Sequence, residues 1–394
     1  MKLNSKAVHS GDRKRSATGW TPVTTPIHTA TSYIYNDMED LDKVFAKEIP
    51  GQSYSRYGNP TNDALEELVA DLESGAGALA CSSGMAALHM AISTALIDRR
   101  RVILAAKLLY GATLGMLTKV FEPAGTEIVF VDFDNLDEVR QAIAEHRPGA
   151  IVMETIANPL LRVPAVDHIA KLANEANAPL IVDNTFASPM LIRPLELGAA
   201  MSVHSLTKYL SGHGDVLGGI VVADRNHIDP LRNLSRTLGL TLGSFECYLA
   251  MRGVKTFPLR MERQCANACR VASWLATHPA VDRVYFPADP RHPDAANIQR
   301  LFPKGLYGAM VSFEVKGADR AAIFRVMSSL KMVVPGTSLG DVHSLMLYPA
   351  MASHRELSPK HRERLGIRDN LLRLSVGIEA AEDIVADLDQ ALTA

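Results

Sequence analysis

The sequence has few of the features that mark secreted, membrane-spanning or nucleic-acid-binding proteins. Its 394 residues include only four cysteines, Cys81, Cys247, Cys265 and Cys269, which lack the paired spacing of a disulfide framework or a zinc site. The N-terminal segment is polar, and no stretch reaches the roughly 18 continuous apolar residues of a membrane span. Charges of both signs are interspersed to a net charge of −2, so no basic stripe would attract nucleic acid or anionic lipid. We therefore expect a cytoplasmic protein with reduced thiols, whose partners are small molecules rather than nucleic acid or membranes.

Length and composition indicate one large domain and a smaller one. The chain is 47% hydrophobic and 21% charged, as in ordinary globular proteins, and it has no internal repeat or low-complexity segment. Residues 1–60 are rich in Ser, Thr, Pro, Gly and Tyr without clear periodicity, which predicts an extended arm that contacts a neighbouring subunit. We expect a large domain over residues 61–256 and a smaller α+β domain over residues 257–394, where long helical patterns and strand-like runs precede a terminal helix.

The large domain shows the alternation of strands and helices that is typical of a parallel sheet. Its first helix is predicted over residues 61–73, where Leu65, Leu68 and Leu72 share one side. Short apolar runs then alternate with amphipathic segments and predict strands at residues 77–81, 101–106, 126–133, 149–156, 179–184, 202–204 and 218–224. Ligands of such sheets bind at the carboxyl ends of the strands, so the residues that follow these runs are site candidates.

One lysine stands in a setting unlike that of an ordinary surface lysine. In MSVHSLTKYLSGHGDVLGG, residues 201–219, Lys208 follows two hydroxyl residues, Ser205 and Thr207, and precedes a glycine-rich run. Asp183 ends another apolar run, PLIVD, and taken alone it is explained equally well as a helix or turn cap. A lysine that forms a Schiff base, a carboxylate that faces a ring nitrogen and a phosphate site together indicate pyridoxal 5′-phosphate (PLP) as the cofactor.

A phosphate site is available in CSSGMAAL, residues 81–88, where a strand is expected to end and a helix to begin. The backbone N–H groups of Gly84 and Met85 would meet an anion at the positive end of that helix, and the hydroxyls of Ser205 and Thr207 would add donors. Small residues join strands to helices in many proteins. This segment therefore indicates a phosphate site only in combination with the lysine and the aspartate.

Seven motifs are spread along nearly the whole chain. They are YSRYGNPT at 54–61, SSGMAA at 82–87, YGAT at 110–113, ETIANP at 154–159, DNTFASP at 183–189, SLTKYLSGHGDVLGG at 205–219 and RLSVGIE at 373–379. In combination they resemble the Cys/Met-metabolism PLP-dependent enzymes, the γ-family of transsulfuration enzymes. The resemblance implies an α/β fold of PLP-dependent transferase fold type I, like aspartate aminotransferase, with a mostly parallel central sheet and a smaller C-terminal α+β domain.

The resemblance also implies roles for individual residues. Lys208 matches the lysine that forms the Schiff base with PLP, and Asp183 matches the carboxylate that pairs with the ring nitrogen. Tyr110 matches the tyrosine that stacks on the ring and takes part in acid–base work on the leaving group. Asn158 matches an asparagine near the phenolic oxygen of the cofactor and the substrate carboxylate. Arg373 matches the arginine that binds this carboxylate with a planar pair of donors.

Further residues match phosphate, substrate and intersubunit contacts of the family. The phosphate contacts match Gly84, Met85, Ser205 and Thr207. Tyr54 and Arg56 match residues that reach the PLP phosphate of the neighbouring subunit, so the active unit is at least a dimer, and a homotetramer built as a dimer of dimers is expected. Ser338, the first residue of SLGDVHS at 338–344, is expected to bind the substrate.

Some departures from the usual motifs concern the substrate. Ala112 stands where methionine-cleaving members often carry a cysteine, which argues against a dedicated methionine lyase. His343 replaces a glutamate that is common in cystathionine-handling members, which puts specificity for cystathionine in doubt. The motif ETIANP at 154–159 and Leu206, which precedes Thr207 and Lys208, also differ from the usual residues of the family. We expect these differences to change the shape of the substrate pocket slightly.

These observations lead to the hypothesis of a PLP-dependent lyase that removes a heteroatom substituent from Cγ of an L-amino acid, giving a 2-oxo acid, ammonia and the leaving group. The alternatives are γ-replacement, by an O-acyl-homoserine sulfhydrylase or a cystathionine γ-synthase, and cystathionine β-lyase. SLGD in place of SLGG also occurs among sulfhydrylase-like members. A non-enzymatic PLP-binding regulator would normally add a DNA-binding module, and none precedes residue 60; the first and last motifs argue against a transaminase.

Other reactive side chains are interpreted as structural. His204, His213 and His343 have no spacing that indicates a catalytic triad or a metal site, and no metal is expected. Cys81, flanked by small residues at a strand end, is interpreted as core packing.

Overall fold

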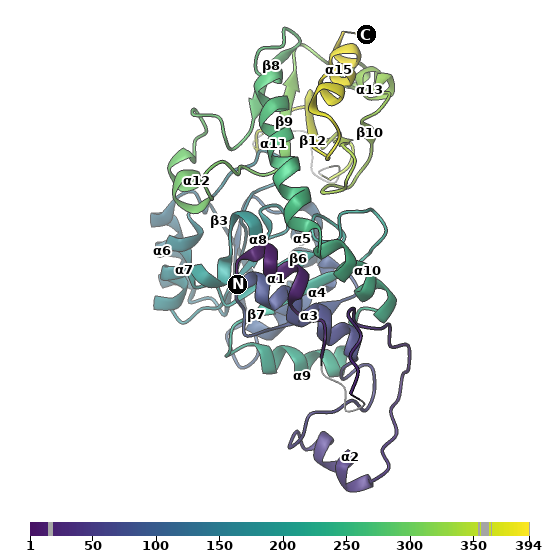
Figure 1. Cartoon of the computed structure of the whole chain (residues 1–394). Coiled ribbons are helices and arrows are strands. Elements are labelled where there is room, and N and C mark those ends of the chain that lie inside the picture. Colours follow the sequence, from purple (N-terminus) through teal and green to yellow (C-terminus); the bar gives the residue numbers. More distant parts are fainter. Residues whose placement is uncertain (15–18, 354, 356–361, 364, 394) are drawn as a thin grey trace.

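The computed structural model describes residues 1–14, 19–353, 355, 362–363 and 365–393, and its centre is a mostly parallel sheet (Figure 1). The sheet has seven strands in the order β1-β7-β6-β5-β4-β2-β3. Their bounds are β1 Gly77–Cys81, β2 Val102–Ala106, β3 Glu127–Val131, β4 Ala150–Glu154, β5 Leu180–Asp183, β6 Met201–Ser205 and β7 Gly219–Ala223. Strand β7 runs in the direction opposite to the other six strands, so the expected fold is confirmed.

Helices cover both faces of this sheet because its strands are apolar on both sides. In β1, for example, Leu79 packs into one buried cluster, whereas Ala78 and Ala80 pack into the other. The first cluster is covered by α4 Gly84–Ala95, α6 Leu136–His146, α7 Val166–Glu175 and α9 Ile228–Leu238. The second is covered by α3 Pro60–Glu73, α8 Ser188–Leu191 and α10 Ser244–Val254. The short α5 Gly111–Met116 continues into a π-helix, Leu117–Phe121, and a 3-10 helix spans Pro194–Leu197.

A second sheet lies beyond the long helix α11, Phe257–Leu275, which runs from the large sheet towards the C-terminal part of the chain (Figure 1). Near its start, Met261 packs with the large sheet, whereas Val271, further along, packs with the second sheet. The strand order is β10-β11-β12-β9-β8. The bounds are β8 Val281–Tyr285, β9 Met310–Val315, β10 Val334–Pro335, β11 Leu345–Leu347, β12 Leu371–Ser375, α12 Ala295–Leu301, α13 Arg320–Ser329 and α15 Ala381–Leu392.

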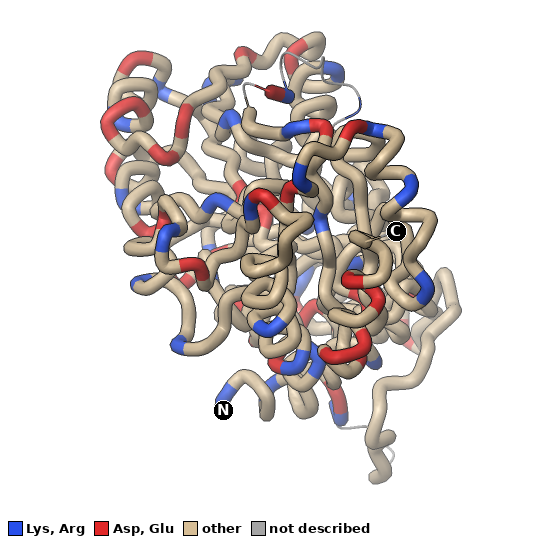
Figure 2. The backbone as a smooth tube through the Cα atoms, turned by 90° about the horizontal axis from the view of Figure 1, so that it is seen from above, with Lys and Arg blue, Asp and Glu red and all other residues tan. Residues whose placement is uncertain are grey.

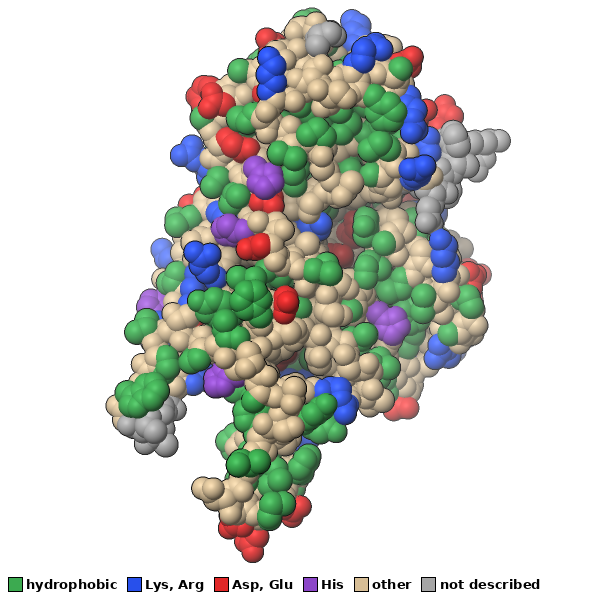
Figure 3. Space-filling view, turned by 90° about the vertical axis from the view of Figure 1, so that its right-hand side faces the viewer, with side chains coloured by type: hydrophobic (Ala, Val, Ile, Leu, Met, Phe, Trp, Pro, Cys, Tyr) green, Lys and Arg blue, Asp and Glu red, His purple; other side chains and the backbone are tan. Residues whose placement is uncertain are grey.

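The N-terminal segment is extended in part, but it also contains two helices. Helix α1, Leu3–His9, packs against α3 and α11, and the Lys6 ammonium donates to the Asp71 carbonyl at 2.7 Å. This docking on the same chain differs from the extended conformation expected at the start of the segment, where few apolar residues signal a helix. Beyond it, the segment with α2, Met38–Phe45, projects from the body (Figure 1). Apolar side chains are visible at the surface of the projecting part (Figure 3). In the N-terminal segment, Trp20 and Ile34 are both exposed.

The surface of the described residues carries charges of both signs (Figure 2). Basic and acidic residues are interspersed along the chain, and neither sign of charge predominates on the side seen in Figure 2. Among the described residues, no helix is both long and apolar enough to cross a membrane.

Candidate cofactor-binding and active site

Three adjacent parallel strands end at one edge of the large sheet and bring polar side chains together. Glu154 ends β4 and lies opposite Asp183, the last residue of β5, while Ser205 ends β6. Helix α4 begins beside them at Gly84, where an added Cβ would lie 2.9 Å from the Ser205 Cβ. Glycine therefore allows the start of α4 to approach β6 closely.

A cavity of about 510 Å³ lies at this edge, within the range of small-molecule sites. Its wall contains nine of the predicted site residues: Gly84, Met85, Tyr110, Asn158, Asp183, Ser205, Thr207, Lys208 and Arg373. Ser338 contacts one of them, because the Lys208 ammonium donates to its hydroxyl at 2.8 Å. The structure thus brings together residues from both sheets that are far apart in the sequence.

The end of the cavity at α4 has the donors that an anion needs. The Ser83 hydroxyl accepts the Ala86 N–H at 3.0 Å, which caps the helix and leaves its first N–H groups available. The helix has 12 residues, and the positive end of its dipole favours a phosphate here. The Thr207 hydroxyl is held by Gly218, from whose N–H it accepts a hydrogen bond at 3.1 Å.

The lysine in this cavity is a better nucleophile than an exposed lysine. Burial, together with the smaller effect of the positive charge of Arg373, lowers the pKa of Lys208 from 10.5 to about 8. An amine with this pKa is partly unprotonated near neutral pH. It can therefore attack a carbonyl and also take up and return protons.

Two carboxyl groups lie side by side at the floor of the cavity. Burial raises the pKa of Asp183, although the Thr185 N–H, which donates to it at 3.0 Å, opposes the rise. Burial also raises the pKa of Glu154, and the neighbouring Asp183 adds to this effect. A cationic group in the cavity would stabilise the ionised carboxylates, and the pyridinium nitrogen of PLP is such a group.

Arg373 is a buried cation whose hydrogen-bonding capacity is not fully used. It is 3% exposed, and its guanidinium donates to the Asn158 side-chain oxygen at 2.8 Å and to the Ser338 carbonyl at 3.4 Å. Burial lowers its pKa to about 10, and its Nε has no partner among the described residues. The site is suited to receive a substrate carboxylate.

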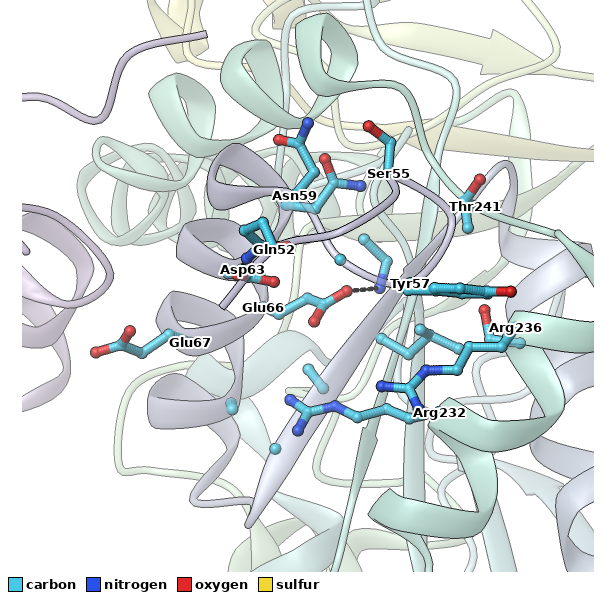
Figure 4. Close-up of a pocket in the computed structure, with 18 of the residues that line it drawn as sticks. Gln52, Ser55, Tyr57, Asn59, Asp63, Glu66, Glu67, Arg232, Arg236 and Thr241 are labelled. Carbon is cyan, nitrogen blue, oxygen red and sulfur yellow. Dashed lines mark hydrogen bonds between the residues drawn. The ribbon is translucent and has the colours of Figure 1, made fainter. Parts of the chain in front are cut away.

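Tyr54 and Arg56, also predicted to contact the cofactor, lie elsewhere in this chain. Arg56 lines a second cavity of about 510 Å³. Figure 4 shows Tyr57, Glu66 and Arg236 on the wall of the same cavity. The Arg56 guanidinium lies 4.9 Å from the centre of the Tyr57 ring and donates to the Arg236 carbonyl. Tyr54 is 43% exposed. Their predicted contact with the cofactor of a neighbouring subunit stays a prediction.

The residues interpreted as structural have partners outside the main cavity. His204 is 1% exposed and lies 2.5 Å from a Glu73 oxygen, and Cys81 is fully buried. His213 contacts the Ser211 carbonyl at 2.6 Å, and a His343 ring nitrogen lies 3.4 Å from Asp341. The described part of the chain contains no cluster of histidine, cysteine and acidic side chains able to hold a metal ion.

The sequence analysis missed five polar wall residues, which are Ser83, Thr185, Thr337, Ser353 and Glu154. The ionisable one among them is Glu154. It ends an apolar run as Asp183 does, so its place at the end of a strand was the signal that could have identified it. Among the apolar wall residues are Ile156, Phe186, Leu217, Leu339 and Leu347.

Comparison with known proteins agrees with this geometry. The family described as Cys/Met metabolism PLP-dependent enzyme matches residues 4–393. The chain is 39% identical over 393 residues to an L-methionine gamma-lyase of Fusobacterium nucleatum subsp. polymorphum, covering 99% of this chain and 98% of that protein. It is 38% identical over 391 residues to a cystathionine beta-lyase of Lactococcus lactis subsp. cremoris, covering 99% and 98%. The crystal structure of a cystathionine gamma synthase from Xanthomonas oryzae pv. oryzae, in complex with cystathionine, has a TM-score of 0.92 at 34% identity and covers 100% of this chain and 98% of that one.

The three names describe different reactions at similar identity, so they show the family and its cofactor rather than one reaction. The donors at α4, the lysine with a lowered pKa and the paired carboxyl groups fit PLP. The chain belongs to the Cys/Met-metabolism family of PLP-dependent enzymes.

Proposed function

We propose that this enzyme removes a heteroatom substituent from Cγ of an L-amino acid, releasing a 2-oxo acid, ammonia and the leaving group. The observation that carries the proposal is the cavity wall. The wall combines Lys208 and Arg373 with apolar side chains. His343, which stands where cystathionine-handling members commonly have a glutamate, is not among the residues that line it. An apolar wall suits a leaving group without charge, such as a thioether or thiol.

The roles follow from the chemistry of each side chain. Arg373 and Asn158 would bind the substrate carboxylate, and Asp183 would face the cofactor ring nitrogen. The N–H groups of Gly84 and Met85 would hold the phosphate together with the hydroxyls at residues 205 and 207. Bound PLP withdraws electrons from the substrate Cα and so makes its proton acidic.

Proton transfer is assigned to two residues. The Lys208 amine takes the Cα proton and returns a proton later, because a pKa of about 8 lets both of its forms exist at neutral pH. A Cγ leaving group also requires removal of a proton from Cβ, and the same amine would take it. Tyr110, a wall residue that is 41% exposed, is the donor that we assign to the leaving group.

The active unit is proposed to be a homotetramer, a dimer of dimers. Tyr54 and Arg56 would then complete the phosphate site of the neighbouring subunit. The exposed apolar side chains of the projecting segment support this, because such side chains are stabilised when a partner covers them.

Two other reactions are carried as alternatives. Replacement at Cγ is favoured by the SLGD sequence at 338–341, and by the similarity to a cystathionine gamma synthase. Elimination at Cβ is favoured by the relative named cystathionine beta-lyase.

The deciding experiment is product analysis by proton NMR. The PLP-loaded enzyme would be given L-homocysteine, L-methionine, L-cystathionine and O-acetyl-L-homoserine in parallel. Formation of 2-oxobutanoate at a rate that does not depend on added sulfide supports γ-elimination. Pyruvate and homocysteine from cystathionine would indicate a β-lyase, and a new thioether or thiol formed only with added nucleophile would indicate replacement. Lys208→Ala is the control and should lose both turnover and the visible cofactor band.

A further inference from the structure

Glu154 is the carboxylate of the cavity wall to which the motif comparison gives no role. It is 7% exposed and lies at the end of β4, beside Asp183 on β5. Placing two carboxyl groups next to each other in a buried site is unfavourable unless both have donors or a counter-charge. The hydrogen-bond partners of Glu154 should therefore explain how a second carboxyl group is accommodated beside Asp183.

Glu154 accepts hydrogen bonds from two separate wall segments. The Tyr110 N–H, at the start of α5, donates to its Oε1 at 2.5 Å. The Asn158 N–H, in the loop after β4, also donates to its side chain. A carboxylate only accepts hydrogen bonds, so it suits a site where two backbone donors converge. One side chain thus connects the segment of the ring-stacking tyrosine to the segment of the substrate-binding amide.

The hydrogen bonds continue from Asn158 to the lysine. Arg373 donates to the Asn158 side-chain oxygen at 2.8 Å and to the Ser338 carbonyl at 3.4 Å. The Lys208 ammonium donates to the Ser338 hydroxyl at 2.8 Å. A displacement of Asn158 would therefore reach the guanidinium directly and the lysine through Ser338.

We propose that Glu154 is a positioning residue that holds Tyr110 and Asn158 in place. It would keep a fixed separation between Tyr110, which is assigned to stack on the cofactor ring, and Asn158, which is assigned to bind the substrate carboxylate. This inference rests on the proposed function for the roles of Tyr110 and Asn158, but its test can be read on bound PLP alone. A residue that only stabilises the fold would affect unfolding and not the environment of the cofactor.

The test uses Glu154→Gln, which keeps the length and one acceptor oxygen, and Glu154→Leu, which removes both acceptors. The matched control is Glu66→Gln. Glu66 is also a carboxylate on a cavity wall, it accepts the Ala80 N–H at 2.9 Å, and burial raises its pKa to about 8, but it lines the second cavity (Figure 4). For each holoenzyme, PLP content, the circular dichroism of the visible cofactor band, the melting temperature, kcat and KM would be measured.

We expect full PLP content in all three variants. Circular dichroism should change in Glu154→Leu, with a smaller change in Glu154→Gln and none in Glu66→Gln. The value of kcat/KM should fall by about tenfold to a hundredfold in Glu154→Leu, the loss that follows when reacting groups move by about 1 Å. The KM should rise along with the fall in kcat, because Asn158 and Arg373 bind the substrate.

Unchanged circular dichroism and kinetics in Glu154→Leu would overturn the proposal, as would equal changes in the Glu66 control. If Glu154→Leu does not fold, Glu154→Gln decides the question by the same two readouts. If the proposed substrate class is wrong instead, the wild type also fails to turn over that substrate. The circular dichroism of the cofactor band still shows whether replacing Glu154 changes the cofactor environment. The two failures are therefore distinguishable.

Discussion

Replacing Lys208 by methionine should stabilise the cofactor-free protein. Burial and, to a smaller extent, the charge of the nearby Arg373 together lower the pKa of this lysine from 10.5 to about 8. That difference corresponds to about 3 kcal/mol, at about 1.4 kcal/mol for each tenfold change in proton affinity. Loss of the hydrogen bond to Ser338 would subtract about 1 kcal/mol. A net gain of about 2 kcal/mol in the free energy of unfolding near pH 7 is therefore expected.

The sign of the pH dependence follows from proton binding. Between pH 8 and pH 10.5 the unfolded chain binds more protons at Lys208 than the folded chain, so the stability of the wild type rises with pH in this window. The gain in stability of the methionine variant should therefore be largest below pH 8 and should vanish above pH 10.5, where only the loss of the hydrogen bond to Ser338 remains.

The assay is urea unfolding of cofactor-free protein near pH 7 and near pH 10, at one protein concentration, because bound PLP and subunit association also stabilise the folded state. Lys171→Met is the control, since the Lys171 side chain is 77% exposed and should show no such gain. A Lys208→Met protein that is no more stable than the wild type near pH 7 would refute the reasoning. So would a gain of equal size at both pH values.

Three further experiments test the site and the subunit arrangement. Arg373→Lys keeps the charge but loses the planar pair of donors, so KM should rise by about tenfold or more while the visible cofactor band is kept; steady-state kinetics and absorbance check this. Gly84→Ala places a Cβ 2.9 Å from the Ser205 Cβ, so the Kd for PLP, measured by absorbance titration of cofactor-free protein, should rise. Arg56→Ala and Lys208→Ala should each be inactive. Hybrid oligomers that contain one subunit of each variant should recover activity, because one of their sites then has both an intact Lys208 and an intact Arg56 from the neighbouring subunit. Hybrids without activity would contradict the proposed intersubunit role of Arg56.

The fold class could be predicted from the sequence because its signals are local. Most strands of the large sheet are short apolar runs, and most are followed directly by a small or polar residue. Asp183 and Lys208 were therefore placed correctly near the carboxyl ends of strands β5 and β6. The motif comparison extended this to Arg373, which no local pattern would have distinguished from a surface arginine.

Contacts between distant segments could not be predicted in this way. Tyr110 and Glu154 are 44 residues apart and Asn158 and Arg373 are 215 apart, so no periodicity links them. Helix α1 was missed for a related reason. Its only buried residue is Ala7, and its docking on α3 and α11 depends on surfaces made by other parts of the chain.

The sequence by itself determined the cofactor chemistry, because a lysine, an aspartate at a strand end and a helix start made of small residues indicate PLP in combination and need no tertiary information to be recognised. Only the tertiary structure decided the pKa of Lys208, the pairing of Arg373 with Asn158 and the place of Glu154 between two wall segments. The physical reason is that burial and the distance between charges are set by segments that meet only on folding. The chain thus encodes the reactive groups locally, and packing gives them their reactivity.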